Sequence, residues 1–250
     1  MLKIRHLTKH YKGSNKGITD LSLHIAPGDI YAFIGHNGAG KTTTLKCVAG
    51  IQGFEAGEIL IDGKNIREEP LACKRQLAYI PDNPDLYEYL TGIQYLNFTA
   101  DVFGVSQRDR QEKIRKYGDV FEITASLGDL ISSYSHGMKQ KLALLSALVH
   151  QPRLLILDEP FVGLDPKAAV LLKDIMRGIC AEGGAIFFST HVLDVAEKLC
   201  NKVAIVKDGR LAASGDMEEI VKPGLSLESI FMEVVEDADT DHDSDKAGTL

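Results

Sequence analysis

The sequence predicts an α/β fold in which a mostly parallel sheet forms the core, with an N-terminal antiparallel β part and an inserted helical subdomain. Several strand-like segments are continuous apolar runs rather than alternating ones, which is typical of strands covered on both faces. Helical patterns separate these runs, and strands that alternate with helices favour an α/β architecture. The chain has 250 residues, of which 44% are hydrophobic, and can therefore bury a sizeable core.

The predicted strands are short apolar segments bounded by turn-forming residues. They are Leu21–Ile25, Ile30–Ile34, Glu58–Ile61, Leu77–Ile80, Leu154–Leu157, Ala185–Ser189 and Val203–Val206. A short strand pair is expected after the last of them, because the Asp208–Gly209 dipeptide favours a tight turn.

The predicted helices show apolar residues at spacings of three and four. They are Lys41–Val48, Met138–Val149, Pro166–Cys180, Val192–Leu199 and Met217–Val221. Between Thr91 and Val149 the strand signal disappears, and helical periodicity runs through Ile93–Phe103 and Gln107–Phe121. We therefore expect the inserted helical subdomain over about 88–150.

The formal net charge of −7 is concentrated near the C-terminus, because residues 233–246 hold seven acidic residues and one lysine. We expect one domain over 1–235, followed by an acidic, disordered tail over 236–250. The rest of the chain is close to neutral. Since binding to a phosphate backbone normally requires a basic excess, we do not expect nucleic acid as a partner.

The four cysteines are widely scattered and form no CxxC or Cys/His cluster, so we predict neither a zinc site nor a disulfide framework. We expect reduced thiols in a cytosolic protein. No apolar stretch approaches the ~20 residues that span a bilayer, and the N-terminus lacks the apolar run of a secretory signal. Any role at a membrane is therefore expected to come through a partner.

Residues 35–42 read Gly-His-Asn-Gly-Ala-Gly-Lys-Thr and fit the phosphate-loop pattern G-x-x-x-x-G-K-[ST] between an apolar strand and a helix. Glycines let backbone N–H groups approach phosphate oxygens, and the helix adds its positive N-terminal end. Lys41 is expected to reach the β- and γ-phosphates, and Thr42 to ligate Mg²⁺. A glycine-rich turn with a chance lysine is the alternative, which this context disfavours. The predicted nucleotide-binding residues of the loop are Gly35, His36, Asn37, Gly38, Ala39, Gly40, Lys41, Thr42 and Thr43.

Two further motifs follow apolar strands. Asp158 and Glu159 come directly after Leu154–Leu157, and the carboxyl ends of parallel strands are where such sheets bind ligands. Asp158 is expected to hold Mg²⁺, directly or through water, and Glu159 to act as the general base that polarises an attacking water. A solvated or helix-capping acid pair is the alternative. His191 follows Ala185–Ser189 at the same sheet edge, where its imidazole could contact the γ-phosphate and the water, although a lone histidine is more often a surface or core residue.

With these motifs in place, the chain from Met1 to about Val221 resembles the nucleotide-binding subunits of ATP-binding-cassette (ABC) transporters, which are P-loop NTPases. Residues 134–140, Tyr-Ser-His-Gly-Met-Lys-Gln, are similar to the family signature Leu-Ser-Gly-Gly-Gln followed by a basic residue. The resemblance implies that Ser135 and Gly137 bind the ATP of a partner cassette. As a free-standing pattern, Ser-x-Gly is a common helix N-cap.

The resemblance also assigns roles to residues outside these motifs. Tyr11 fits the aromatic residue that stacks on adenine, with simple packing as the alternative. Residues 163–166, Gly-Leu-Asp-Pro, resemble the loop that crosses the dimer interface, with a plain helix start as the alternative. Asp82 stands where the family usually has a glutamine that contacts Mg²⁺. It is predicted as a metal contact because a carboxylate is a strong hard-cation ligand, and a turn aspartate is an equally good interpretation.

The resemblance implies an ATP hydrolase that uses Mg²⁺, pairs head to tail with an identical or related second cassette, and drives a separate integral-membrane permease from the cytoplasmic face of the cell membrane. A groove near 82–95 is expected to receive a helix of that permease. The signature carries Tyr134, His136 and Met138 in place of Leu, Gly and Gln, a variation familiar from exporter-type cassettes, so an exporter is expected. The competing hypothesis is a soluble cassette ATPase in translation or DNA repair, which normally carries two cassettes, a long coiled coil or zinc modules.

Overall fold

The structure is a computed structural model that describes residues 1–11, 13 and 16–234, so the predicted tail over 236–250 lies outside the described residues. Within the described residues, six strands form the main sheet and four form a smaller sheet. In spatial order the main sheet contains β10 (Arg210–Asp216), β9 (Lys202–Lys207), β3 (Ile30–Ile34), β8 (Ala185–Thr190), β7 (Leu154–Asp158) and β6 (Leu77–Ile80). The smaller sheet contains β2 (Gly17–Ile25), β1 (Leu2–His10), β4 (Ala56–Ile61) and β5 (Lys64–Asn65).

The main sheet is parallel except at one edge. Strands β9, β3, β8, β7 and β6 pair in parallel, and only β10 runs antiparallel to its neighbour β9. Every residue of β3, β7 and β8 is buried, as expected for central strands covered on both faces. The smaller sheet pairs antiparallel throughout. These observations confirm the predicted fold class.

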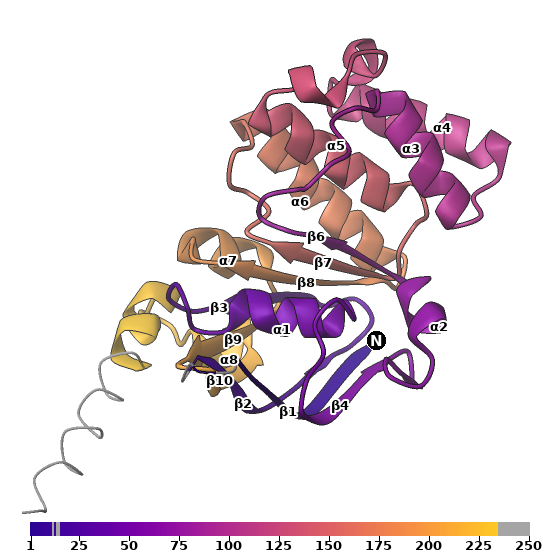
Figure 1. Ribbon diagram of the computed structural model, residues 1–250. Coiled ribbons are helices and arrows are strands. Elements are labelled where there is room, and N and C mark those ends of the chain that lie inside the picture. Colours follow the sequence, from indigo (N-terminus) through magenta and orange to yellow (C-terminus); the bar gives the residue numbers. More distant parts are fainter. Residues whose placement is uncertain (12, 14–15, 235–250) are drawn as a thin grey trace, which may run out of the picture.

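The two faces of the main sheet support two hydrophobic cores. On β3, Ile30, Ala32 and Ile34 belong to one core, and Tyr31 and Phe33 belong to the other, following the alternation of side chains along a strand. Figure 1 shows α5 (His136–Leu148) and α6 (Pro166–Ala181) over the first core, while α1 (Lys41–Val48) lies between the main sheet and the antiparallel sheet. The loop of residues 35–40 therefore lies at the end of a central strand that is covered on both faces.

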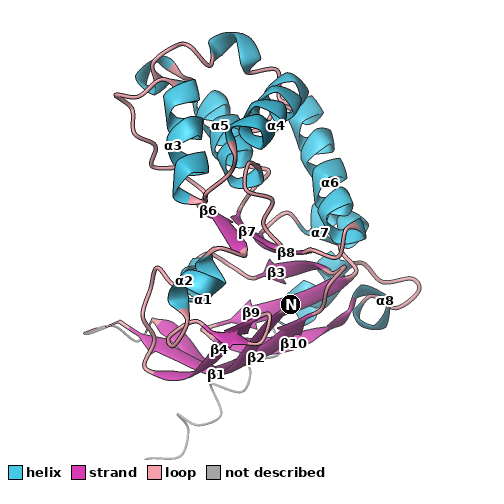
Figure 2. Cartoon of the chain, turned by 90° about the vertical axis from the view of Figure 1, so that its right-hand side faces the viewer, coloured by secondary structure: helices cyan, strands magenta, loops and turns pink. Residues whose placement is uncertain are grey.

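The segment between β6 and β7 is helical. It contains α3 (Gly92–Val102), α4 (Gln107–Val120), α5 and the short 3₁₀ turns Thr124–Ser126 and Ile131–Ser133. Figure 2 shows these helices together on the side of the main sheet away from the antiparallel sheet. Helix α3 begins with a capping box between Thr91 and Gln94. The boundaries of the helical subdomain stay a prediction.

The remaining labelled elements are α2 (Pro70–Lys74), α7 (Leu193–Leu199) and α8 (Met217–Ile220), and residues 227–234 are also helical. Strands β1 and β5, helix α2 and the helical residues 227–234 are absent from the strands and helices predicted segment by segment. Helix α5 begins at His136, two positions before the predicted Met138, because the Ser135 hydroxyl accepts a hydrogen bond from the Met138 N–H at 3.3 Å and caps the helix.

Candidate nucleotide-binding site

The loop of residues 35–40 connects the end of β3 to the start of α1. A Cβ atom at Gly35 would lie 2.5 Å from the carbonyl oxygen of Val206 on β9, so only glycine fits there. Gly40 precedes the helix with φ of +105°, a conformation that L side chains rarely adopt. The two glycines allow the chain to turn tightly from the sheet into α1, which leaves the unpaired N–H groups of the first helical turn available to a ligand.

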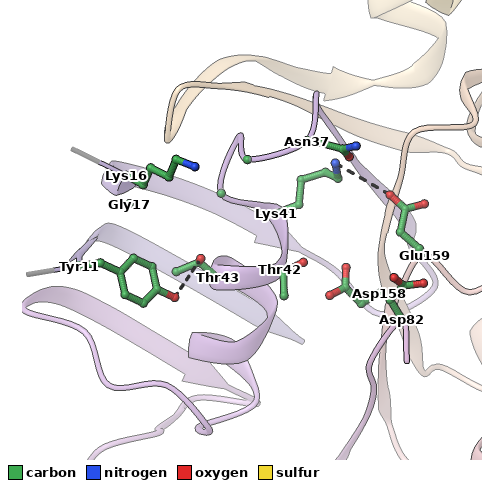
Figure 3. Close-up of a pocket in the computed structure, with 12 residues that line it drawn as sticks. Tyr11, Lys16, Gly17, Asn37, Lys41, Thr42, Thr43, Asp82, Asp158 and Glu159 are labelled. Carbon is green, nitrogen blue, oxygen red and sulfur yellow. Dashed lines mark hydrogen bonds and ion pairs between the residues drawn. The ribbon is translucent and has the colours of Figure 1, made fainter. Parts of the chain in front are cut away.

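A cavity of about 370 Å³ opens over this loop. Figure 3 shows Tyr11 and Lys16 at one end of the cavity and three carboxylates at the other, with Lys41 and Thr42 between them. An aromatic ring at one end and cationic and hard-oxygen groups toward the other suit a nucleotide with its metal. The cavity is lined by Tyr11, Lys16, Gly17, Asn37, Gly38, Gly40, Lys41, Thr42, Thr43, Asp82, Asp158 and Glu159.

Lys41 is buried at the base of the cavity, with 7% of its surface exposed. Its ammonium group donates to the carbonyl oxygens of Gly35 at 2.7 Å and His36 at 3.3 Å. Burial lowers the pKa of Lys41, and the nearby carboxylates of Glu159 and Asp158 oppose this effect. The Glu159 oxygen lies 3.9 Å away, at the outer limit of an ion pair. A phosphate in the cavity would therefore supply counter-charge that the protein provides only in part.

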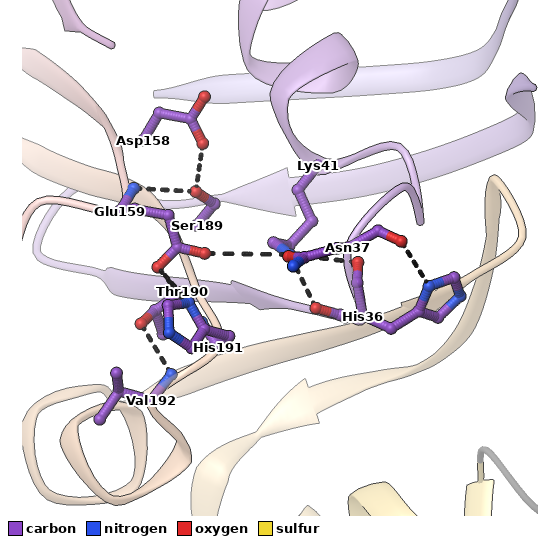
Figure 4. A network of polar contacts seen from close by, with 10 residues as sticks. His36, Asn37, Lys41, Asp158, Glu159, Ser189, Thr190, His191 and Val192 are labelled. Carbon is purple, nitrogen blue, oxygen red and sulfur yellow. Dashed lines mark hydrogen bonds and ion pairs between the residues drawn. The ribbon is translucent and has the colours of Figure 1, made fainter. Parts of the chain in front are cut away.

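Asp158 and Glu159 are held in place by a serine that the sequence did not single out. The Ser189 hydroxyl donates to Asp158 Oδ1 at 2.5 Å and accepts from the Glu159 N–H at 3.1 Å, and its residue is fully buried. Figure 4 shows this serine between the two acidic residues. The contact arises because β7 and β8 pair with Asp158 opposite Ser189.

Glu159 adopts a left-handed backbone conformation with φ of +48°, directly after β7. His191 Nδ1 lies 2.9 Å from one Glu159 carboxylate oxygen, and the His191 N–H donates to the same oxygen at 3.3 Å. The other oxygen of Glu159 faces Lys41 (Figure 4). The structure therefore brings together Glu159, His191 and Lys41, and it places a fixed carboxylate at the edge of the cavity, where a water molecule could meet a phosphate.

The other predicted residues of the nucleotide site differ in position. Tyr11 lies within hydrogen-bonding distance of Thr43, with 3.3 Å between the hydroxyl groups. Ala39 is fully buried, so its side chain supports the loop rather than the cavity. The His36 ring contacts the Asn37 carbonyl oxygen at 2.9 Å and lies 3.6 Å from Asp208, outside the cavity lining.

Ser135 and Gly137 lie at the start of α5 and are not among the described residues that line the cavity. Ser135 is exposed and Gly137 is half-buried. One copy of the chain therefore assembles the phosphate loop, the acid pair and His191, but it does not bring the signature segment into the same cavity.

The fold and this site define the protein as a P-loop ATPase. A family model described as "ABC transporter" matches residues 18–162. The chain belongs to that family as an ATP-binding subunit, and its catalytic domain is an ABC-type ATPase. The predictions of family and ATPase activity are thereby confirmed.

Individual relatives agree with this assignment. The ABC-type transporter ATP-binding protein EcsA of Bacillus subtilis (strain 168) is 32% identical over 241 residues, covering 95% of this chain and 97% of EcsA. The uncharacterised ABC transporter ATP-binding protein YxlF of the same organism is 37% identical over 220 residues, covering 88% of this chain and 72% of YxlF. A solved ATP-binding subunit of an ABC transporter superposes with a TM-score of 0.89 at 34% identity, covering 94% of this chain and 99% of that one.

Within residues 1–11, 13 and 16–234, no helix is both long enough and apolar enough to cross a membrane.

Proposed function

We propose that this chain is the ATPase subunit of an exporter, that it acts as a head-to-tail pair of cassettes, and that it drives a separate integral-membrane permease at the cytoplasmic face of the cell membrane. The observation that carries the proposal is the separation between the signature residues and the cavity that contains Lys41. A second cassette would supply Ser135 and Gly137 to the open side of that cavity, so that each ATP lies between two subunits. The Tyr134, His136 and Met138 variation of the signature supports an exporter.

The residues present fit Mg²⁺. Thr42, Asp82 and Asp158 line the same cavity, and their hydroxyl and carboxylate oxygens are the donors that Mg²⁺ prefers. Among the described residues no cluster of three or more His, Cys, Asp or Glu could hold a metal ion alone. Mg²⁺ usually binds through one or two carboxylates together with waters and substrate phosphates. The bound ion would neutralise charge on the β- and γ-phosphates.

The proposed hydrolysis uses the geometry around Glu159. Its carboxylate would accept a proton from the attacking water, while His191 on one side and Lys41 on the other fix its orientation. Lys41 would bind the transferred phosphate, and Tyr11 would stack on the adenine ring at the other end of the cavity. Release of the γ-phosphate would remove the group that the partner's signature segment binds, and the pair would open.

A second cavity supports a permease as the partner. It measures about 460 Å³ and is bounded mainly by β6, α3 and α5, with Ile80, Leu86 and Tyr95 in its lining. Three large side chains beside it are exposed, namely Tyr87 at 46%, Tyr89 at 76% and Phe98 at 48%. Contiguous exposed apolar groups mark interaction surfaces. We propose that a short helix of the permease packs here, which favours a transporter over a soluble ATPase in translation or DNA repair.

Mixing two inactive variants tests the head-to-tail arrangement. Lys41→Ala disables the phosphate loop and Ser135→Arg blocks the signature, so each variant alone should lack ATPase activity. In a mixed pair both changes meet in one site and leave the other site intact. Random pairing makes about half of the pairs mixed, so ATP hydrolysis should recover to at most ~25% of the native rate. No recovery on mixing, in chains that still form pairs with ATP, would contradict an ATP site shared between two subunits.

Crosslinking tests the permease surface. A photoreactive side chain in place of Tyr89 should form an adduct with an integral-membrane protein in intact cells. The matched control is Val170, which is 57% exposed on α6. Mass spectrometry of the adducts identifies the partner. Equal adducts from both positions, or ribosomal proteins at position 89, would contradict the proposed surface.

A further inference from the structure

His136 and Gly163 are in direct contact, although 27 positions separate them in the sequence. A Cβ atom at Gly163 would lie 2.6 Å from His136 Cδ2 and 2.8 Å from His136 Nε2. Gly163 also has φ of +78°, a conformation that favours glycine. The imidazole therefore lies against a backbone position where no larger residue fits without displacing the ring.

Two more contacts join the same segments. The carbonyl oxygen of Gly163 lies 3.1 Å from the position that a Cβ atom would take at Gly137. Lys141 Nζ lies 2.8 Å from Asp165 Oδ2, while Asp165 Oδ1 accepts from the Ala168 N–H at 2.8 Å and caps α6. The first turns of α5 therefore fix the position of residues 163–165.

The other end of this connection is Glu159. The Val162 N–H donates to the Glu159 carbonyl oxygen at 3.2 Å, closing a turn that ends immediately before Gly163. The Glu159 carboxylate in turn contacts His191 and faces Lys41. Through its contact with Gly163, His136 is therefore connected to Glu159 by a turn of only a few residues. A turn this short has little freedom to absorb a movement of the His136 ring.

We propose that His136 is a positioning residue, which acts through Gly163 to hold the turn that begins at Glu159, and which thereby couples the two ATP sites of a pair. The proposal rests on the proposed function, in which Ser135 and Gly137 bind the partner's ATP while Glu159 of the same chain acts on its own ATP. ATP bound at the signature would fix the start of α5. The His136 ring, packed against Gly163, would then hold the turn that begins at Glu159 in one position. Because the family signature Leu-Ser-Gly-Gly-Gln has glycine where this chain has His136, the contact depends on the histidine variant of the signature.

A double-mutant cycle tests the contact in the full chain. His136→Ala removes the ring, and Gly163→Ala introduces the methyl group that displaces it. We expect His136→Ala to lower kcat about fivefold, and Gly163→Ala to lower it about tenfold in the native background but only about twofold in the His136→Ala background. The KM for ATP should change little, because Ser135, Gly137 and the phosphate loop are intact.

Gly183→Ala is the matched control. Gly183 has φ of +83° and nothing within 4 Å of an added Cβ atom, so it introduces the same backbone strain without a contact. Its kcat should stay at the native value. An equal loss from Gly163→Ala in both backgrounds would show that the ring and the loop are not coupled, and would overturn the proposal.

Mixed pairs separate coupling within a chain from direct contact with ATP. One chain carries Glu159→Gln, which leaves a single hydrolysing site, and two affinity tags isolate the mixed pair. His136→Ala in the hydrolysing chain should lower the rate about fivefold, whereas the same change in the Glu159→Gln chain should leave the rate unchanged. A loss that comes instead, or equally, from the Glu159→Gln chain would overturn the proposal, because the ring would then act on the ATP that it faces. Hydrolysis by unpaired chains would instead refute the proposed function, and the double-mutant cycle would still report on the contact.

Discussion

Glu159→Gln is expected to abolish most ATP hydrolysis while ATP binding survives. A positioned general base contributes about 10²- to 10⁴-fold to a rate, so phosphate release at saturating Mg-ATP should fall by roughly that factor. Glutamine keeps the shape of the side chain and can still meet His191, which lies 2.9 Å from the native carboxylate. The loss would therefore report on the missing proton acceptor rather than on a collapsed site.

The same variant should accumulate as an ATP-bound pair of chains, because the γ-phosphate that joins the cassettes is no longer removed. Size-exclusion chromatography with and without ATP measures this shift. Glu182→Gln is the matched control, since Glu182 is an exposed residue at the end of α6 and makes the same change of charge. A variant at 159 that hydrolyses ATP within about threefold of the native rate would show that another group is the base.

The sequence predicts the central strands well because each is one continuous apolar run. Strand β1 is not predicted in this way, because its pattern of buried residues is locally irregular. Leu2, Ile4 and Leu7 are its buried residues, and their spacing is not strictly alternating. His6 adopts φ of +50° between Ile4 and Leu7, where the register with β2 shifts. The irregularity carries Leu7 back to the core face, and a period of two in the sequence cannot reveal it.

The candidate site likewise contains residues that the sequence predicts and residues that it does not. The glycine pattern, Lys41, Asp158 and Glu159 are readable because each motif is local in the chain. Ser189 is not, because its role follows from the pairing of β7 with β8 and from a register that places it opposite Asp158. The sequence shows a serine at position 189. That it contacts both Asp158 and Glu159 depends on the order of strands in the sheet, which only the structure gives.

Lys16 and Gly17 are two further residues of the site that the sequence does not predict. Lys16 and Gly17 line the cavity beside Tyr11, yet they belong to no motif. They line the cavity because β2 begins at Gly17, which pairs with His10 at the end of β1, and this pairing brings Lys16 and Gly17 beside Tyr11. Tyr11 was predicted from the resemblance, whereas its neighbours required the structure.

Lys41→Ala is expected to weaken ATP binding by about 100-fold or more and to remove hydrolysis, because truncating one partner of a buried charge pair costs several kcal/mol. Binding to the isolated chain is measured by calorimetry or with a fluorescent ATP analogue. Lys46→Ala is the matched control, since Lys46 lies in the last turn of the same helix and its removal changes the charge equally. It should bind ATP as the native chain does.

The loss of ATP binding by Lys41→Ala should not result from unfolding, because burial of the Lys41 ammonium group costs stability, as the lowered pKa of Lys41 indicates. Burial lowers that pKa below its unfolded value. Between the two pKa values the unfolded chain binds more protons, so stability rises with pH in that window, and below the folded-state pKa the full cost of burying the ammonium is present. Lys41→Ala removes this cost, so the melting temperature without nucleotide should equal or exceed the native one, while the increase that ATP produces should disappear. A variant that binds and hydrolyses ATP like the native chain would refute the phosphate loop as the nucleotide site, since Lys41 is the buried cation on which that site depends.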